Sequence, residues 1–418
     1  MEFSEKIIGL AKEAEQALAE RFAIVDAISL VNTARVMDAF REHRVSEAMF
    51  NPTSGYGYDD KGRDTLDEIW ADVMGAEAAF VRHSIVSGTH ALTIALFGLL
   101  RPGDIMLSIA GKPYDTLEEV IGITGKDGDG SLRDFGVTYS QVDLLEDGSF
   151  DLPKIGYALR AGGKRVKVVF IQRSKGYLNR KTLSVDEIGE VIKFVKSTAP
   201  DCYVVVDNCY GEFVETKEPT AVGADMIVGS LIKNPGGGMA ETGGYIAGTK
   251  RAVELASYRL TSPGVGCETG ATLGFNKSLY KGLFYAPHTV AQSIKTAHLA
   301  AYMFAALGYD VEPRYDEARH DIIQSVITHS PEALCALCRG IQKGSPVDAF
   351  VTPEPWAMPG YSDPVIMAAG AFTQGSSIEL SADGPLRPPY TAFLQGGLTY
   401  ESGKIGILCA AEEMLKLQ

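Results

Sequence analysis

The 418-residue sequence lacks the features that mark several classes of protein. Positive charge is scarce: 39 Lys and Arg residues stand against 53 Asp and Glu residues, so the chain offers no overall basic surface to a nucleic acid. The first six residues contain neither the basic region nor the apolar core of a secretory signal. No apolar run reaches the roughly 20 residues that a membrane-spanning helix needs. We therefore expect a cytoplasmic protein that binds neither nucleic acid nor membrane.

Patterns for metal binding and for disulfides are missing as well. The six cysteines are scattered among mostly apolar neighbours, as reduced thiols in a cytosolic protein would be. Cys335 and Cys338 form a C-x-x-C pair, but no second pair completes a zinc site, and their apolar surroundings predict a structural role on one face of a helix. The seven histidines show no metal-ligand spacing. We therefore expect no metal site.

The composition that remains is that of a globular protein too long for a single ordinary core. Hydrophobic residues make up 45% of the chain and charged residues 22%, and these values exclude a disordered protein. We expect three segments. They are a helical segment at residues 1–50, a large α/β domain at 51–288 and a smaller α+β domain at 289–418.

Short β-rich runs alternate with helix-like runs in the large predicted domain. The expected strands are Ala79–Arg82, Ile105–Ile109, Val137–Gln141, Val166–Ile171, Tyr203–Val206, Met226–Val228 and Gly244–Ala247. The expected helices are Leu66–Met74, Ala91–Leu100, Thr116–Ile121 and Val185–Ser197. This alternation predicts a mostly parallel, seven-stranded sheet with helices on both faces.

The last part of the chain has a different pattern. A long helix is predicted over residues 289–307 and should end at Gly308, because glycine commonly follows the last turn of a helix. Strand-like runs at 321–328 and 377–380 and a helix at 331–340 follow it. This mixture predicts the smaller α+β domain.

Polar or aromatic residues follow five of the predicted strands, at the point where each strand ends. They are Ser87 to His90, Tyr114, Arg173 to Lys175, Asp207 with Asn208, and Ser230 with Lys233. In open α/β sheets, ligands bind beyond the carboxyl ends of the strands. The convergence of five strand ends therefore predicts one ligand site at one edge of the sheet.

Asp207 and Lys233 indicate which ligand this is. Asp207 directly follows an apolar run, and Lys233 stands between Ser230 and a run of three glycines. Desolvation would lower the pKa of such a lysine and leave a nucleophilic amine, which can hold pyridoxal 5'-phosphate (PLP) as a Schiff base. A carboxylate at a strand end can keep the pyridine nitrogen protonated, which lets the ring accept electrons. A turn or cap is the alternative for Asp207, but together the two residues predict PLP, with Lys233 as a catalytic residue.

Ser87, Gly88 and Thr89 open a predicted helix and are candidates for binding the phosphate of the cofactor. A helix N-terminus offers N–H groups and a partial positive charge, and a glycine lets the phosphate approach the backbone. The alternative is an ordinary N-cap, because Ser and Thr are common caps. Beside Asp207 and Lys233 we favour the phosphate.

Two further residues have both a functional and a structural interpretation. Tyr114 follows a strand and would stack on the planar ring of the cofactor, unless it only caps the helix that starts there. Arg387 stands among prolines and would bind the α-carboxylate of an amino-acid substrate through two hydrogen bonds. The alternative for Arg387 is a loop salt bridge.

With these residues in place, the chain resembles fold-type-I PLP-dependent enzymes of the aspartate aminotransferase-like fold. More closely, it resembles the cystathionine β-lyase and methionine γ-lyase-related family that is often called aluminium-resistance proteins. The blocks that carry this resemblance are Ser87–His90, Lys112–Asp115, Val206–Glu212, Gly229–Gly238 and Leu386–Glu401. It implies a homo-oligomer, namely a dimer with shared active sites, often paired into a tetramer.

The resemblance also implies roles for single residues. Ser230 would bind the phosphate of the cofactor, and Tyr56 or Tyr58, with Arg63, would reach the phosphate in a neighbouring subunit. The same resemblance supports Tyr114 in ring stacking, which makes it a candidate catalytic residue beside Lys233, and Arg387 in carboxylate recognition. The lysine block differs from the Ser-x-Thr-Lys-Tyr type of well-studied lyases, so substrate specificity does not carry over.

We therefore expect a PLP-dependent carbon–sulfur lyase that carries out β- or γ-elimination on a sulfur-containing amino acid such as cystathionine, cysteine or methionine. The same residues would serve an aminotransferase or an aldolase-type enzyme, because the cofactor sets the chemistry. A non-catalytic PLP-binding regulatory protein is the alternative from another functional class.

Overall fold

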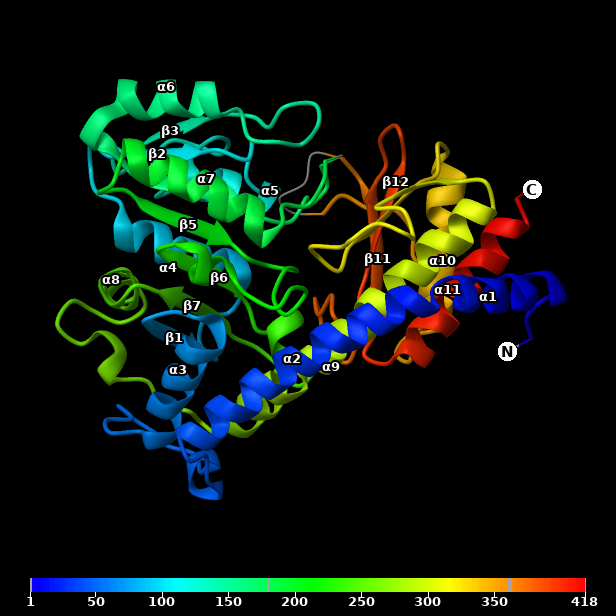
Figure 1. The fold of residues 1–418 in the computed structure, drawn as a ribbon, viewed down its shortest axis with the longest axis horizontal. Coiled ribbons are helices and arrows are strands. Elements are labelled where there is room, and N and C mark those ends of the chain that lie inside the picture. The colour runs from blue at the N-terminus through cyan, green and yellow to red at the C-terminus, as the bar shows by residue number, and fades with distance from the viewer. Residues whose placement is uncertain (1, 179, 359–362, 418) are drawn as a thin grey trace. The chain divides into compact units, whose positions relative to one another are not determined.

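Seven strands form one sheet in the computed structural model, which describes residues 2–178, 180–358 and 363–417 (Figure 1). They are β1 (Ala78–Arg82), β2 (Ile105–Ser108), β3 (Thr138–Gln141), β4 (Val166–Gln172), β5 (Tyr203–Asp207), β6 (Met226–Ser230) and β7 (Gly244–Gly248). Their order is β1-β7-β6-β5-β4-β2-β3, and β7 runs antiparallel to both neighbours while the other pairs are parallel. The predicted strands are confirmed, each with ends within two residues of the predicted ones.

Helices connect these strands and cover the sheet. They are α3 (Lys61–Met74), α4 (Gly88–Leu99), α5 (Asp115–Ile121), α6 (Leu152–Gly162), α7 (Val185–Thr198) and α8 (Lys250–Leu260). Short 3-10 helices lie at η1 (Glu47–Phe50), η2 (Gly163–Arg165), η3 (Pro219–Val222), η4 (Asn234–Gly236) and η5 (Gly266–Glu268). The helices α6 and α8 are additional to the predicted ones.

The core of this region lies between the sheet and α4. Phe170 of β4, Val205 of β5 and Val228 of β6 have no exposed surface, and they pack in one cluster with Ala95 and Leu96 of α4. Burying a large apolar side chain stabilises a fold by about 1.5–3 kcal/mol relative to leaving it in water. Strands covered on both faces have uninterrupted apolar sequences, and for this reason the strands could be recognised.

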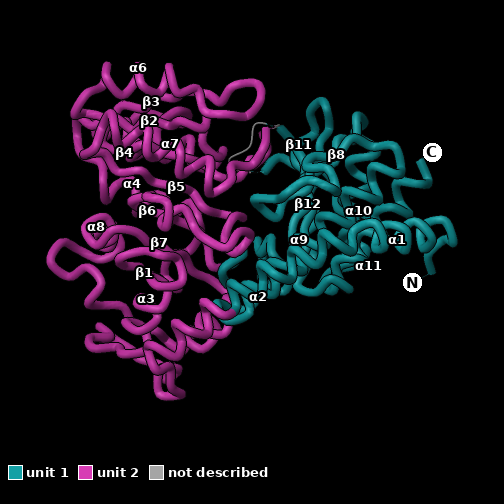
Figure 2. Tube along the Cα trace, viewed as in Figure 1, with its two compact units in different colours: residues 1–33, 232–239, 282–418 teal, residues 34–231, 240–281 magenta. Residues whose placement is uncertain are grey.

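The chain forms two compact units, shown in different colours in Figure 2. Residues 34–231 and 240–281 make up the unit that contains the seven-stranded sheet. Residues 1–33, 232–239 and 282–418 make up the other unit. The two units therefore interleave along the sequence.

The second unit is built on a smaller, antiparallel sheet. Its strands, in spatial order, are β10 (Val365–Ala368), β11 (Ser381–Pro385), β12 (Thr391–Gln395), β9 (Gln324–Ile327) and β8 (Asp310–Glu312). Its helices are α1 (Glu5–Ala17), the first part of α2 (Ala19–Glu42), most of α9 (Asn276–Ala306), α10 (Pro331–Gly344) and α11 (Tyr400–Leu415). Leu334 and Ile341 of α10 and Ile407 of α11 are fully buried in its core. This is the predicted α+β arrangement.

The strand predicted at residues 377–380 is wrong. These residues form a turn, and the strand β11 begins only at Ser381. The carboxylate of Glu379 accepts hydrogen bonds from the backbone N–H groups of Phe372 at 2.7 Å and Thr373 at 2.9 Å. These bonds close a loop that a pattern of alternating side chains cannot reveal.

The predicted start of the long helix is also wrong. Helix α9 begins at Asn276, 13 residues before the predicted start at residue 289 (276 to 289), and it contains Pro287 in its interior. Proline normally ends a helix, because it lacks an N–H and its ring crowds the preceding turn. Here the Pro287 carbonyl accepts a hydrogen bond from the Ser29 hydroxyl of α2 at 3.1 Å. The predicted end is confirmed to within one residue, with Gly308 close behind in the left-handed conformation.

The C-x-x-C pair lies on α10, as the sequence predicts. Cys335 and Cys338 are both buried, and burial raises the pKa of each thiol above its usual value. The described part of the chain contains no group of three His, Cys, Asp or Glu residues that could hold a metal ion. Within the same residues, no helix is both long enough and apolar enough to cross a lipid bilayer.

Asp383 of β11 should make the stability of the fold depend on pH. Burial raises the pKa of this carboxyl from 3.8 to about 7, although Nε2 of Gln395 donates to it at 3.0 Å. A folded-state pKa above the unfolded value means that the folded chain holds the proton more tightly. Its stability should therefore fall between about pH 4 and pH 7, by up to about 1.4 kcal/mol per pH unit.

Urea unfolding at pH 5 and at pH 8 measures this effect. The Asp383→Asn variant should lose less stability than the unmodified chain on going from pH 5 to pH 8. An equal loss in both proteins would show that Asp383 does not titrate in this range.

Candidate active site

Three buried polar residues lie together at the carboxyl edge of the large sheet. Gln172 ends β4, Asp207 ends β5 and Ser230 ends β6, and all three are buried. Gln172 lies directly opposite Asp207 in the β4–β5 pairing, and Asp207 lies opposite Val228, two residues before Ser230, in the β5–β6 pairing. The parallel register therefore brings their side chains to one place.

The N-terminus of helix α4 abuts this edge. A Cβ atom added to Gly88 would lie 3.5 Å from the Cβ of Ser230 and 3.4 Å from the Sγ of Cys209. The hydroxyl of Ser87 accepts a hydrogen bond from the His90 N–H at 3.0 Å, so this residue is an N-cap, as its alternative interpretation holds. The partial positive charge of the helix end faces the strand ends.

The hydroxyl of Ser230 is buried without a hydrogen bond. Ser230 is 1% exposed, and its Oγ has no hydrogen-bond partner among the described residues. A buried polar group without a partner is costly, so such groups in native proteins commonly bind a ligand or a water molecule. An oxygen of a phosphate group placed between Ser230 and the start of α4 would supply the missing partner.

Asp207 is held by the turn that follows β5. Its Oδ1 accepts the backbone N–H of Cys209 at 3.1 Å. The next residue, Asn208, accepts from the Arg173 guanidinium at 2.8 Å and donates to Glu218 at 2.9 Å. Arg173 is fully buried and also donates to the carbonyl of Gly211 at 3.0 Å. This buried network fixes the backbone on which the Asp207 carboxylate is mounted.

The ring of Tyr114 lies beside the end of β4. Tyr114 precedes the first residue of α5, and its ring is tilted by 50° against that of Tyr177, with centroids 6.0 Å apart. A Cβ atom added to Gly176 would lie 3.0 Å from the Tyr114 ring and 3.2 Å from the Nε2 of Gln172. Thr89 and Thr116 join the starts of α4 and α5 through hydroxyls 2.7 Å apart. An aromatic face therefore lies near the buried carboxylate.

Gln172 lies at the same edge of the sheet, and the sequence did not single it out. Its Nε2 donates to the carbonyl of Ser174 at 3.0 Å, whereas its Oε1 is buried and has no partner within the described residues. Because the Ser174 carbonyl can only accept a hydrogen bond, the NH2 group of the Gln172 side chain must face it, and Oε1 points away from Ser174. The available signal was positional, because Gln172 ends its strand as Asp207 ends the next one.

Lys233 comes shortly after the carboxyl end of β6 in the sequence. It stands three residues after Ser230 (230 to 233), is half-buried, and precedes η4 as its N-cap residue. Its carbonyl accepts the N–H of Gly236 at 3.2 Å, and Gly237 and Gly238 have positive φ angles of 56° and 74°. Glycine adopts this backbone without strain, which explains the run of glycines after the lysine.

The loop that carries Tyr56 and Tyr58 is exposed, and the buried side chain of Arg63 supports it. The two tyrosines are 75% and 61% exposed, and their rings stack with centroids 5.6 Å apart. Arg63 is 2% exposed, and its guanidinium donates to the carbonyl of Gly57 at 2.6 Å and to that of Gly270 at 3.1 Å. Arg63 thus supports the loop that presents the two aromatic rings.

Arg387 lies in the turn between β11 and β12. It forms an ion pair with Asp363 at 3.0 Å, which is the structural alternative considered for it. Its side chain is 44% exposed, so the guanidinium is not confined to this pair. The turn is closed by a hydrogen bond from the N–H of Tyr390 to the carbonyl of Arg387 at 2.8 Å.

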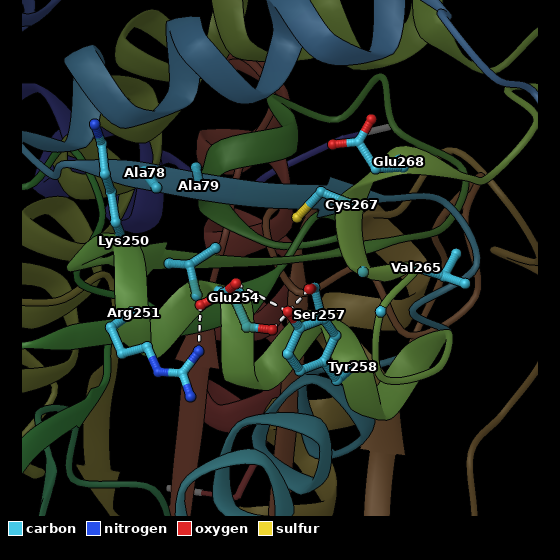
Figure 3. A pocket seen from close by; sticks show the side chains of 13 residues that line it. Ala78, Ala79, Lys250, Arg251, Glu254, Ser257, Tyr258, Val265, Cys267 and Glu268 are labelled. Carbon is cyan, nitrogen blue, oxygen red and sulfur yellow. Dashed lines mark hydrogen bonds and ion pairs between the residues drawn. The ribbon is translucent and has the colours of Figure 1, made fainter.

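A pocket of about 610 Å³ lies at the opposite edge of the large sheet (Figure 3). Ala78 at the start of β1 and Lys250 at the start of α8 line it, and the pairing of Ala78 with Gly248 places it beside the amino ends of the parallel strands. Its polar groups pair with one another, as the hydroxyl of Tyr258 does by donating to Glu254 at 2.8 Å. No predicted site residue lines this pocket.

Comparison with known proteins identifies related chains. Residues 7–415 match the family model described as methionine gamma-lyase. An uncharacterized protein, YnbB of Bacillus subtilis, is 52% identical over 408 residues, which cover 98% of this chain and 96% of that protein. The crystal structure of a carbon–sulfur lyase involved in aluminium resistance from Clostridium novyi is 51% identical with a TM-score of 0.94, covering 98% of this chain and 96% of that one.

The fold extends to more distant proteins. The PLP-dependent protein YhfS of Escherichia coli has a TM-score of 0.62 at 15% identity, covering 94% of this chain and 97% of that one. At this identity the likeness concerns the fold alone. It agrees with the predicted fold class, the fold type I of PLP-dependent enzymes, with a large mostly parallel sheet.

Proposed function

Because the chain belongs to the methionine gamma-lyase family, we propose that it is a PLP-dependent carbon–sulfur lyase acting on a sulfur-containing amino acid. The observation that carries this proposal is the unpartnered Oγ of Ser230, which is buried against the N-terminus of α4. Ser230 stands two residues after Val228, the residue that pairs with Asp207 on the neighbouring strand. A hydroxyl that can donate to a phosphate, a helix N-terminus and a carboxylate at one sheet edge fit the two ends of a pyridoxal phosphate molecule.

Each predicted site residue then has a task in holding the cofactor. The start of α4 at Ser87, Gly88 and Thr89 would bind the phosphate together with the Ser230 hydroxyl. Asp207 would hold a proton on the pyridine nitrogen, and Tyr114 would cover one face of the ring. Tyr56 or Tyr58 would contact the phosphate of a neighbouring subunit's cofactor in a homodimer or a pair of homodimers, and Arg63, which was predicted to reach that phosphate too, supports their loop from its buried position.

The remaining residues act on the substrate. Bound PLP supplies an electron sink for the pair left behind when the α-proton of the amino acid departs. The ε-amine of Lys233 would hold the cofactor in the resting enzyme and, once released by the amine of the substrate, would take the α-proton as a general base. Arg387 would exchange Asp363 for the α-carboxylate of the substrate and so orient it.

A product assay tests this activity against its rivals. Purified protein with PLP is incubated separately with L-cystathionine, L-cysteine and L-methionine, and keto acid, ammonia and the sulfur product, which is a thiol or, from L-cysteine, hydrogen sulfide, are measured. A lyase releases all three kinds of product without a second substrate, as we expect here for at least one of them. An aminotransferase would form keto acid only when a second keto acid is added, and an inert PLP-binding protein would form no product.

Replacing Ser230 with alanine tests the phosphate site without an activity assay. The Ser230→Ala variant should bind PLP about 10- to 100-fold more weakly, because a hydrogen bond to a charged group contributes about 1.5–3 kcal/mol. Its cofactor-free form should be as stable as the unmodified chain, since the hydroxyl has no partner in the described structure to lose. Titration of the apo-protein with PLP and urea unfolding measure the two quantities.

A matched control for Ser230 is Ser257 on α8. Its buried hydroxyl donates to the carbonyl of Glu254 at 2.8 Å, at the other edge of the sheet. The Ser257→Ala variant should keep its PLP affinity and lose about 1 kcal/mol of stability. If Ser230→Ala binds PLP as tightly as the unmodified chain, the phosphate is held elsewhere.

A further inference from the structure

Helix α2 is apolar on two opposite faces. One face is buried, with Val25, Val36 and Ala39 at most 6% exposed. Figure 1 shows α2 running alongside α9, where Asp26 forms an ion pair with Lys295 at 2.6 Å. This face is the ordinary core-facing stripe of an amphipathic helix and leaves the other face to be explained.

The second apolar face of α2 is exposed. Four large side chains on it are open to solvent: Ile24 at 45%, Leu30 at 71%, Val31 at 51% and Met37 at 38%. With three exposed alanines they recur every three or four residues and therefore share one side of the helix. We call this set the α2 stripe: Ala23, Ile24, Ala27, Leu30, Val31, Ala34 and Met37.

An exposed stripe of this kind needs a partner. Single exposed apolar residues are normal on protein surfaces, but a contiguous apolar patch marks a site of association. From residue 23 to residue 37 every helix position on this side is apolar, and the charged residues of α2 lie on its flanks or beyond these ends. Nothing in the described part of the chain covers the α2 stripe.

We propose that a second copy of this chain covers the α2 stripe, with the two α2 helices packed antiparallel. Except for Ala23, whose counterpart would be Asp38, the stripe is symmetric about the point between Leu30 and Val31. An antiparallel copy centred there sets Ala27 against Ala34 and Ile24 against Met37. Small residues then face small ones, which lets the helices approach, and large residues pack beside them.

The charges at the ends of the stripe favour this orientation. Glu20 and Arg41 lie on the same side of the helix, each 10.5 residues from the centre, and the Arg41 side chain is 73% exposed. Antiparallel packing places Glu20 of each copy opposite Arg41 of the other copy. Parallel packing would instead set like charges against each other, which is unfavourable.

The assembly size tests the existence of this interface. Light scattering on the full chain should give a Leu30→Glu variant half the molar mass of the unmodified protein. A Tyr157→Glu variant, altered at a 72% exposed aromatic residue on α6, should keep the full mass. An unmodified protein that is monomeric, or a Leu30→Glu variant of unchanged mass, overturns the proposal and leaves the stripe to a different protein.

Disulfide trapping tests the orientation. Antiparallel packing brings residue 27 next to residue 34 of the second copy, so a variant with both Ala27→Cys and Ala34→Cys should form a covalent dimer on oxidation. In the single variant Ala27→Cys the two thiols would be about 10 Å apart along the axis, too far for a disulfide, whose Cα atoms lie within about 7 Å.

The outcomes of the trapping experiment are distinct. Dimer from the double variant alone supports the proposed packing, and dimer from Ala27→Cys alone would show a parallel pair and overturn it. No covalent dimer from either variant overturns it as well. Neither readout requires catalysis, so the interface is tested independently of the proposed lyase activity.

Discussion

A Lys233→Ala variant should turn over the substrate at least about 10³-fold more slowly than the unmodified enzyme. The variant loses the amine that holds the cofactor and the general base for the α-proton, and a positioned base alone contributes about 10²–10⁴-fold. The rate constant kcat is measured with whichever of L-cystathionine, L-cysteine and L-methionine the unmodified enzyme cleaves, at saturating PLP.

Lys250→Ala is the matched control for this variant. Lys250 lines the pocket at the opposite edge of the sheet and is not part of the candidate active site. Its replacement should leave kcat within about twofold, as is usual for surface changes away from special features. A Lys233→Ala enzyme that keeps a tenth or more of the original rate would mean that another amine performs both tasks.

The second large effect is expected for Asp207. An Asp207→Asn variant should lower kcat by about 10²–10³-fold, the usual loss when one preorganised electrostatic group is removed from an active site. The amide has the same shape as the carboxylate, and its oxygen can still accept the Cys209 N–H, which lies at 3.1 Å from Oδ1 of Asp207. The amide carries no negative charge, however, and so it cannot hold a proton on the pyridine nitrogen.

The Asp207→Glu variant separates charge from structure. It keeps the carboxylate and should retain more activity than Asp207→Asn, while both variants should bind PLP and unfold at similar urea concentrations. If the asparagine and glutamate variants lose activity equally, position and not charge is what matters at residue 207. If neither loses activity, Asp207 is not a site residue.

The large sheet could be predicted from sequence because its strands are buried on both faces. Val168 to Ile171 in β4 and Val204 to Val206 in β5 are fully buried, so selection against polar residues leaves uninterrupted apolar runs. The parallel register then follows from the alternation with helices. For the same reason the sequence alone places Asp207 and Ser230 at one edge of the sheet.

Features set by tertiary contacts could not be predicted. The alternating pattern at residues 377–380 resembled a strand, and only the hydrogen bonds accepted by Glu379 show that it is a turn. The start of the long helix was predicted 13 residues too late (276 to 289), and Pro287 lies inside α9, where the hydroxyl of Ser29 on another helix donates to its carbonyl.

The site itself was predictable in its charged residues and less so in its neutral ones. Asp207 and Lys233 stand out, because charges beside apolar runs are rare. Gln172 does not, since its importance rests on a buried Oε1 that has no partner in the described structure. Arg63 likewise gave no sign in sequence that its guanidinium supports backbone carbonyls at Gly57 and Gly270.

Identifying the lysine that carries the cofactor would test the central claim most directly. Protein purified with PLP should show an absorbance band near ~420 nm that borohydride removes, as expected for PLP bound through a lysine. Borohydride fixes the cofactor covalently, so mass spectrometry of the digested protein should find it on the peptide that contains Lys233. A label on a different lysine, or none after incubation with excess PLP, would contradict the account.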